Sequence, residues 1–166
     1  MDIRIGLGID FHRFAPERDL ILGGVVIPHS LGLDGHSDAD VLLHALCDAL
    51  LGAAALGDIG HHFPTTDPAY EGISSLELLR RTVALLAAAG YEPQQVDAVV
   101  VAERPVLAPY VPTMRERIAA VLGADVSAVS VKATTPEGIG ALGRGEGIGA
   151  WAVALIIRTG GGDPGT

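Results

Sequence analysis

The sequence contains little cysteine and few aromatic residues. Cys47 is the only cysteine among 166 residues, so the chain can form no internal disulfide, and a reducing, cytoplasmic location is expected. It lies in a stretch rich in Ala and Leu, which favours a small buried residue over a reactive thiol. Aromatic residues make up 4% of a chain that is 49% hydrophobic, so Ala, Leu, Val and Ile must build the core.

Basic residues and long apolar runs are also scarce. The 11 basic residues are outnumbered by 20 acidic ones, and the net charge of -9 indicates neither a nucleic-acid nor a membrane partner. The apolar run at residues 41–56 is interrupted by His44 and Asp48 and is too short to span a bilayer. No apolar signal segment is expected at the N-terminus. An anionic substrate would therefore need bound cations to reverse the local field.

Local patterns predict four strands, a small hairpin and three helices. The strands are expected at 3–12, 96–102, 129–133 and 148–158, and the hairpin at 20–28. The helices are expected from Ser37 to about Leu56, from Ser74 or Ser75 to Gly90, and over 111–122. Segments 57–70 and 136–147, rich in glycine, are predicted loops, and long loops are often functional.

This order of elements predicts an α+β fold. It suits a two-layer sandwich, in which a mixed four-stranded sheet, with the small hairpin beside it, carries the helices on one face. Since the other face would be uncovered, self-association is the simplest way to cover it. One domain is expected over residues 1–159, followed by a disordered tail at 160–166.

Asp10, His12 and His44 are candidate metal ligands. Asp10 and His12 lie two apart on a predicted strand, so their side chains point to the same face. His44, on the following helix, could supply a third ligand. Three protein ligands with one open position have the form of a catalytic zinc site. On spacing alone, an Asp-x-His pair on a strand is more often a surface pair or a hydrogen bond at a strand end.

Three further groups could take part in chemistry. His36 and Ser37 open the predicted helix of His44, where backbone N–H groups suit a phosphate, or they form an ordinary turn with a serine cap. Asp48 could orient the His44 imidazole or be a solvated carboxylate. Residues 132–137 and 143–147 offer hydroxyls, carboxylates and free backbone for phosphate and magnesium, or they are simple connectors.

Several blocks taken together are more specific than any one of them. Residues 4–14 are RIGLGIDFHRF, residues 35–45 are GHSDADVLLHA, and residues 55–64 are ALGDIGHHFP. VKATT follows at 131–135 and GRGEGI at 143–148. In order and spacing, over residues 4–158, the chain resembles the 2-C-methyl-D-erythritol 2,4-cyclodiphosphate synthases.

The resemblance implies an enzyme, a phosphorus–oxygen lyase of the non-mevalonate isoprenoid pathway, acting as a homotrimer with active sites at subunit boundaries. It implies conversion of 4-diphosphocytidyl-2-C-methyl-D-erythritol 2-phosphate to the 2,4-cyclodiphosphate with release of CMP. The substrate's own 2-phosphate attacks its β-phosphorus, which fits a chain without a Ser-His-Asp or Cys-His set. The implied cofactors are zinc and a second divalent cation, magnesium or manganese.

The resemblance also assigns roles to residues. Asp10, His12 and His44 match zinc ligands, Glu137 matches a ligand of the second ion, and His36 and Thr135 match the groups that stabilise the transition state. The residues that match substrate-binding positions are Asp10, His12, His36, Ser37, Asp58, Ile59, Gly60, Phe63, Pro64, Thr65, Thr66, Asp67, Ala102, Glu103, Arg104, Pro105, Val106, Leu107, Ala108, Thr134, Thr135, Pro136, Glu137, Ala141 and Arg144.

Three positions depart from the family pattern. Val106 stands where a lysine is common near the nucleotide, and Pro136 replaces a threonine, which removes a hydroxyl and a backbone N–H. Ala141 replaces a phenylalanine near the central cavity of the trimer, which weakens the expectation of isoprenoid binding there. None of the three is a predicted zinc ligand.

Two other functions are open alternatives. A non-catalytic trimer could hold a metal structurally or bind an isoprenoid in its interior. A structural zinc site, however, normally has four protein ligands, often cysteines. A metal-dependent phosphohydrolase would use water as its nucleophile and give a linear product.

Overall fold

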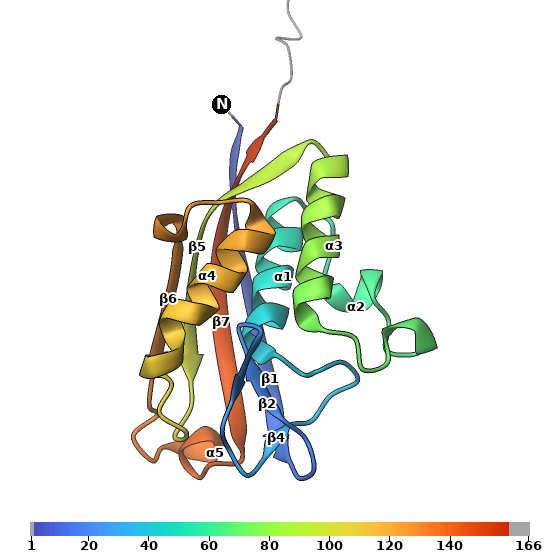
Figure 1. Cartoon of the computed structure of the whole chain (residues 1–166). Coiled ribbons are helices and arrows are strands. Elements are labelled where there is room, and N and C mark those ends of the chain that lie inside the picture. Colours follow the sequence, from blue (N-terminus) through green and yellow to red (C-terminus); the bar gives the residue numbers. More distant parts are fainter. Residues whose placement is uncertain (1, 160–166) are drawn as a thin grey trace, which may run out of the picture.

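The computed structural model describes residues 2–159, in which three main helices pack on one face of a mixed sheet (Figure 1). The sheet has five strands in the order β4-β1-β7-β5-β6, and only β5 and β6 are parallel. The strands are β1 (Ile3–Ala15), β4 (Gly32–Leu33), β5 (Tyr91–Val101), β6 (Val129–Thr134) and β7 (Gly147–Arg158). The α+β prediction is confirmed, except that the short edge strand β4 was missed. The predicted disordered tail lies outside the described residues.

The helices on this face are α1 (Val41–Ala53), α3 (Ser75–Ala88) and α4 (Val111–Leu122). The hairpin forms a separate two-stranded sheet of β2 (Leu20–Leu22) and β3 (Val25–Ile27), as predicted. Both predicted loops contain short helices: α2 (Ile59–His62) and the 3₁₀ turn Pro68–Tyr70 in the first, and α5 (Gly140–Gly143) in the second. Two further 3₁₀ turns are Ala108–Tyr110 and Val126–Ala128. Within residues 2–159, no helix has the length and hydropathy needed to cross a bilayer.

The predicted start of the first helix at Ser37 is wrong. Ala39 has a φ of 57°, which a right-handed helix cannot contain, and α1 begins only after Asp40. The Asp40 carboxylate accepts hydrogen bonds from the backbone N–H groups of Gly23, Gly24 and Leu43 at 2.7–3.1 Å. Burial raises the pKa of Asp40 to about 6, although these three donors favour the ionised form. Asp40 thus caps the start of α1 and bonds it to the turn of the hairpin.

The other helix ends follow local rules. α4 ends where predicted, at Gly123, whose φ of 66° is the left-handed conformation that commonly terminates helices. The second predicted helix is α3, which starts at Ser75.

β5 begins at Tyr91 instead of Val96, because its first residues pair with the end of β7, where Tyr91 is opposite Arg158. Long-range strand pairing of this kind leaves little local signal.

Two glycines of β1 allow α1 to lie directly on the sheet. A Cβ atom at Gly6 would be 1.9 Å from the carbonyl oxygen of Ala49, and one at Gly8 would be 1.9 Å from that of Ala45. Alternate residues of a strand share a face, so Asp10 and His12 follow the two glycines along the face that α1 covers. The close approach therefore places the first turn of α1, which carries His44, beside Asp10 and His12.

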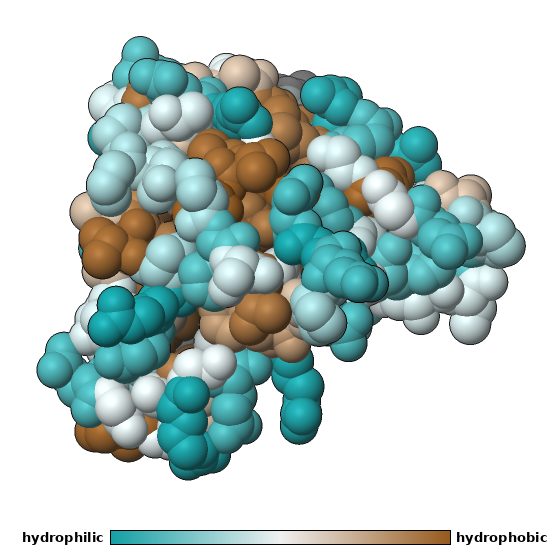
Figure 2. Space-filling model, turned by 60° about the horizontal axis from the view of Figure 1, so that its bottom comes forward, coloured by the Kyte–Doolittle hydropathy of each residue, from teal (hydrophilic) through white to brown (hydrophobic). Residues whose placement is uncertain are grey.

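The opposite face of β1 is apolar and uncovered in the single chain. Its alternate residues are between 44% and 69% exposed: Ile3, Ile5, Leu7, Ile9 and Phe11. Apolar surface is also exposed between hydrophilic patches when the molecule is viewed from the end that carries α5 (Figure 2). Such a continuous apolar strand face is typical of an interface with another chain.

Candidate metal centre and active site

Three side chains from β1 and α1 converge on one point. Oδ2 of Asp10 lies 2.9 Å from Nε2 of His12 and 3.1 Å from Nδ1 of His44. The two imidazole nitrogens are 3.1 Å apart. Ligands bound tetrahedrally to zinc at about 2.0–2.1 Å are separated from one another by roughly 3.3 Å. The structure thus brings the three predicted ligands together at nearly the separation that a shared ion would impose.

The environment of these ligands favours a positive charge. Burial raises the pKa of Asp10, but the adjoining imidazoles of His12 and His44 outweigh it and hold that pKa well below its usual range. Burial lowers the pKa of His12, but the Asp10 carboxylate and the contact with Asp34 together raise it more, so the net shift is upward. An ionised carboxylate between two imidazoles suits a divalent cation, and nitrogen and oxygen donors suit zinc among others. The donor set therefore fits the implied ion.

A cavity of about 230 Å³ opens beside the three ligands. It is lined by the following predicted site residues: Asp10, His12, His36, Ser37, His44, Ile59, Gly60, Phe63 and Thr65. Sequence reasoning missed three further lining residues, Tyr70, Ile73 and Leu78. Leu78 had the helical spacing of a core residue, and nothing in the sequence distinguished Tyr70 or Ile73. The cavity is therefore mainly apolar apart from the metal ligands, His36, Ser37 and Thr65.

Other predicted loop residues support this cavity from outside. Asp58 caps α2 by accepting a hydrogen bond from His61 N at 2.9 Å, and Asp67 accepts one from Ala69 N at 2.9 Å. Pro64 and Thr66 do not line the cavity. The Asp48 carboxylate accepts a hydrogen bond from Ile59 N at 2.8 Å, so it anchors α2 instead of orienting His44.

His36 and Ser37 lie in the loop before α1, and Arg18 holds this loop in place. The Arg18 guanidinium donates to the carbonyl oxygens of Gly35 at 2.6 Å and of Ser37 at 2.5 Å, which flank His36. Nε2 of His36 is buried and has no hydrogen-bond partner among residues 2–159. No local pattern predicts the Arg18 contacts, because the partners are 17 and 19 positions away.

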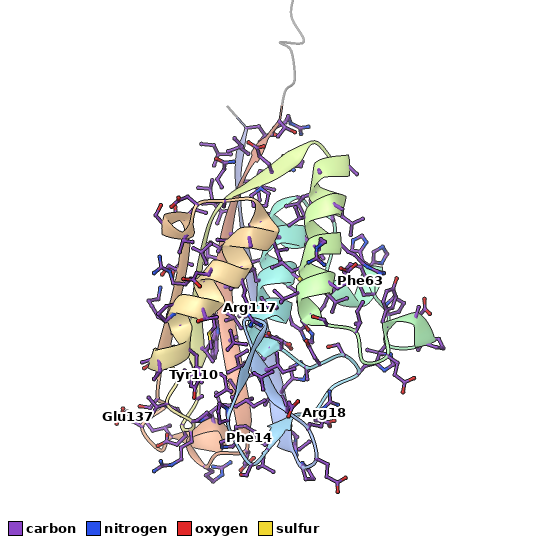
Figure 3. The ribbon with its side chains drawn as sticks, in the orientation of Figure 1. Phe14, Arg18, Phe63, Tyr110, Arg117 and Glu137 are labelled. Carbon is purple, nitrogen blue, oxygen red and sulfur yellow. The ribbon has the colours of Figure 1, made fainter. Side chains whose placement is uncertain are left out.

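The remaining predicted residues form a second group. A separate cavity of about 170 Å³ is lined by the predicted substrate-binding residues of the 102–108 stretch, except Arg104, together with Thr134 and Thr135. Ala102 N donates to Thr134 O at 3.1 Å, which joins the two segments. Thr135 Oγ1 donates to Glu137, whose φ is 53°. Figure 3 shows Glu137 and Phe63 on opposite sides of the molecule, so one chain does not bring the two groups together.

Pro136, Ala141 and Arg144 are near this second group but do not line its cavity. Pro136 and Ala141 line a third cavity, of about 450 Å³, beside Phe11 and Arg13. Arg144 pairs with Glu146 at 2.7 Å. The structure therefore places Pro136 and Ala141 at the end of the molecule that carries α5, in a cavity that His12 also lines.

Comparison with known proteins identifies one family. The model of the YgbB family matches residues 3–157, nearly the whole described chain. This chain belongs to the YgbB family. The chain is 66% identical over 152 residues to the 2-C-methyl-D-erythritol 2,4-cyclodiphosphate synthase of Symbiobacterium thermophilum, covering 92% of this chain and 97% of the relative. The family resemblance in the sequence, and the prediction of an enzyme, are confirmed.

Several solved structures have the same fold as this chain. The bifunctional IspDF of Campylobacter jejuni matches with a TM-score of 0.91 and 40% sequence identity. The match covers 95% of this chain and 42% of the longer bifunctional chain. A CDP complex of IspF from Plasmodium falciparum has a TM-score of 0.83 and 34% identity, with 95% and 97% of the two chains covered. These matches include the sheet and the helices that position the candidate site.

Proposed function

We propose that the protein converts 4-diphosphocytidyl-2-C-methyl-D-erythritol 2-phosphate into 2-C-methyl-D-erythritol 2,4-cyclodiphosphate and CMP. The observation that carries this proposal is the convergence of Asp10, His12 and His44 beside a cavity, in a chain of this family. The reaction forms a bond between a 2-phosphate oxygen and the β-phosphorus and breaks the bond from that phosphorus to the CMP oxygen. No protein nucleophile is needed, because the attacking group belongs to the substrate.

Positioning is the main task of the protein in such an intramolecular reaction. Holding two reacting groups in line can lower a barrier by up to ~7–11 kcal/mol. Phe63, Ile59 and Leu78 give the cavity apolar walls that suit the methylerythritol carbon chain. His36 and Ser37 present polar atoms to the same cavity and would bind phosphate oxygens there. Arg18 keeps their loop in place through the carbonyl oxygens on either side of His36.

Asp10, His12 and His44 would hold zinc, which supplies a Lewis acid for the phosphate oxygens. Glu137 would be the one protein ligand of a second ion, magnesium or manganese, because such ions keep water and substrate phosphates as their other ligands. With a net charge of -9, the protein needs these cations to accept a polyanionic substrate. Thr135, next to Glu137, would donate a hydrogen bond to the reacting phosphates.

We also propose a homotrimer whose active sites lie between subunits. Within one chain the metal ligands and the 102–108 stretch line different cavities, so a complete site needs both groups from neighbouring chains. The exposed apolar face of β1 offers the surface for such an assembly. The 102–108 stretch would bind the cytidine of the substrate, which is supported by the CDP complexes among similar structures.

One product analysis separates this function from its two alternatives. The protein would be incubated with the cytidyl substrate and zinc plus magnesium, and CMP and the phosphorus NMR spectrum of the products would be measured. Cyclisation gives CMP and two phosphorus nuclei that couple to each other. Hydrolysis would give CMP and two uncoupled phosphate monoesters, and a non-catalytic binding protein would release no CMP.

A further inference from the structure

Behind the metal centre, His44 contacts two serines. Its Nδ1 faces Asp10 and His12, while its Nε2 lies 3.0 Å from Oγ of Ser37 and 3.1 Å from Oγ of Ser75. Ser75 is fully buried at the start of α3, and His44 is 7% exposed. A neutral imidazole carries its proton on one nitrogen only, and only the bare nitrogen can bind a metal. The hydrogen bonds at Nε2 therefore decide whether Nδ1 is ready for an ion.

Asp38 determines in which direction the Ser75 hydroxyl points. Its carboxylate accepts two hydrogen bonds from Ser75, one from the backbone N at 2.9 Å and one from Oγ. An ionised carboxylate has no proton to donate, so the single hydroxyl proton of Ser75 must point to Asp38. Oγ of Ser75 can then only accept from His44. Nε2 of His44 must therefore carry the proton, and Nδ1 is left bare towards Asp10 and His12.

Ser37 alone would not determine the tautomer. Its Oγ accepts from Ala39 N at 3.1 Å, and its own proton is free to rotate, so the hydroxyl could either accept from Nε2 or donate to it. The position of Asp38 is fixed, because its backbone N donates to Ile73 O at 3.1 Å and its side chain is bound by Ser75. The combination of Asp38 and Ser75 thus removes the ambiguity that Ser37 leaves.

We propose that Asp38 and Ser75 are positioning residues that fix the tautomer of His44, with Nδ1 turned bare towards the metal centre. His12 is arranged in a parallel way, since its Nδ1 donates to the carbonyl oxygen of Asp34 and leaves Nε2 bare. The proposal rests on the proposed function only in taking His44 as a metal ligand. Loss of such hydrogen-bonded partners typically lowers metal affinity by about 10–100-fold.

Two variants test the proposal. Asp38→Asn keeps the shape of the side chain. Its amide oxygen would keep the shorter bond from Ser75 N, at 2.9 Å, and give up the one from Asp40 N, at 3.2 Å. The NH₂ group would then donate to Oγ of Ser75 and turn the hydroxyl proton towards His44 Nε2. Ser75→Ala removes the hydroxyl and leaves only Ser37. Ser74→Ala is the matched control, because the adjacent Ser74 makes no side-chain capping hydrogen bond.

Two readouts on the full chain decide the outcome. Zinc affinity, measured by competition with a chelator, should fall about 10–100-fold in Asp38→Asn and Ser75→Ala and stay at the parent value in Ser74→Ala. Nitrogen-15 NMR of the metal-free protein, at a pH where its imidazoles are neutral, should place the His44 proton on Nε2 in the parent and on Nδ1 in Asp38→Asn. A parent His44 protonated on Nδ1, or zinc affinities within twofold of the parent in both variants, would overturn the proposal.

The NMR readout also separates this proposal from the proposed function. A parent that binds no zinc at these three residues contradicts the metal centre. The tautomer of its His44 would still decide the role of Asp38 and Ser75.

Discussion

Nδ1 of His44 lies 3.1 Å from Oδ2 of Asp10, although the two residues are 34 positions apart and belong to a helix and a strand. The contact depends on how closely α1 lies on β1, which depends in turn on Gly6 and Gly8. The metal ligands, the cavity beside them and the fold are thus linked through one strand–helix contact.

Replacing Gly8 with alanine should disrupt this contact. The new Cβ would lie 1.9 Å from Ala45 O and 2.6 Å from Ala49 N, which are backbone atoms that cannot rotate away. We expect Gly8→Ala to lower the free energy of unfolding by about 2–3 kcal/mol, as in other overpacked cores, and to weaken zinc binding. Urea unfolding measures the first effect. Gly52 lies in α1, and a Cβ atom added there would meet no atom within 4 Å. Gly52→Ala should therefore raise the free energy of unfolding by about 0.5–1 kcal/mol. A Gly8→Ala protein as stable as the parent would contradict this account.

His44→Ala should abolish stoichiometric zinc binding. Two remaining ligands do not hold zinc tightly, and a catalytic site normally has three. Metal analysis after dialysis should give about one zinc per chain for the parent and almost none for the variant. His29→Ala is the control, because His29 stacks on Phe14 and bonds to Leu31, away from the three ligands. Full zinc content in His44→Ala would remove His44 from the site.

Glu137→Gln should separate the two ions. We expect lower turnover and a higher magnesium requirement with unchanged zinc content, because Glu137 is not among the residues that converge on the zinc site. Magnesium titrations of the steady-state rate, together with metal analysis, provide the measurement. Glu116→Gln, exposed on α4, should behave like the parent. Loss of zinc in Glu137→Gln, or an unchanged magnesium dependence, would show that the assigned role is wrong.

Sites shared between subunits should allow two inactive variants to rescue each other. His44→Ala lacks a metal ligand, and Thr135→Val lacks the hydroxyl in the other cavity. If each site takes one group from each of two neighbouring chains, random mixing at equal amounts should restore about a quarter of parent activity. Activity would be measured after joint refolding, with each variant refolded alone as control. No recovery in trimers proven to be mixed, or full activity in a monomer by light scattering, would contradict shared sites.

Local patterns predicted most elements and placed Asp10 and His12 on one strand face, because strand alternation and helix-stop residues act over a few positions. The strand that carries Asp10 and His12 and the helix that ends at Gly123 are examples. Contacts between segments that are distant in the sequence have no local pattern from which they could be predicted. The hydrogen bond between Ser75 and His44 spans 31 positions, and the carboxylate of Asp40 bonds to a hairpin 16 and 17 positions earlier. The start of α1 was missed for the same reason.

The central claim is that Asp10, His12 and His44 bind one zinc ion in a site that completes its coordination with the substrate's phosphates. Anomalous X-ray diffraction at the zinc edge, from crystals grown with zinc and CDP, tests it most directly. The account predicts one strong peak about 2.0–2.2 Å from Asp10 Oδ2, His12 Nε2 and His44 Nδ1. A crystal with no peak at these atoms, or with His44 turned away from the bound ion, would contradict it.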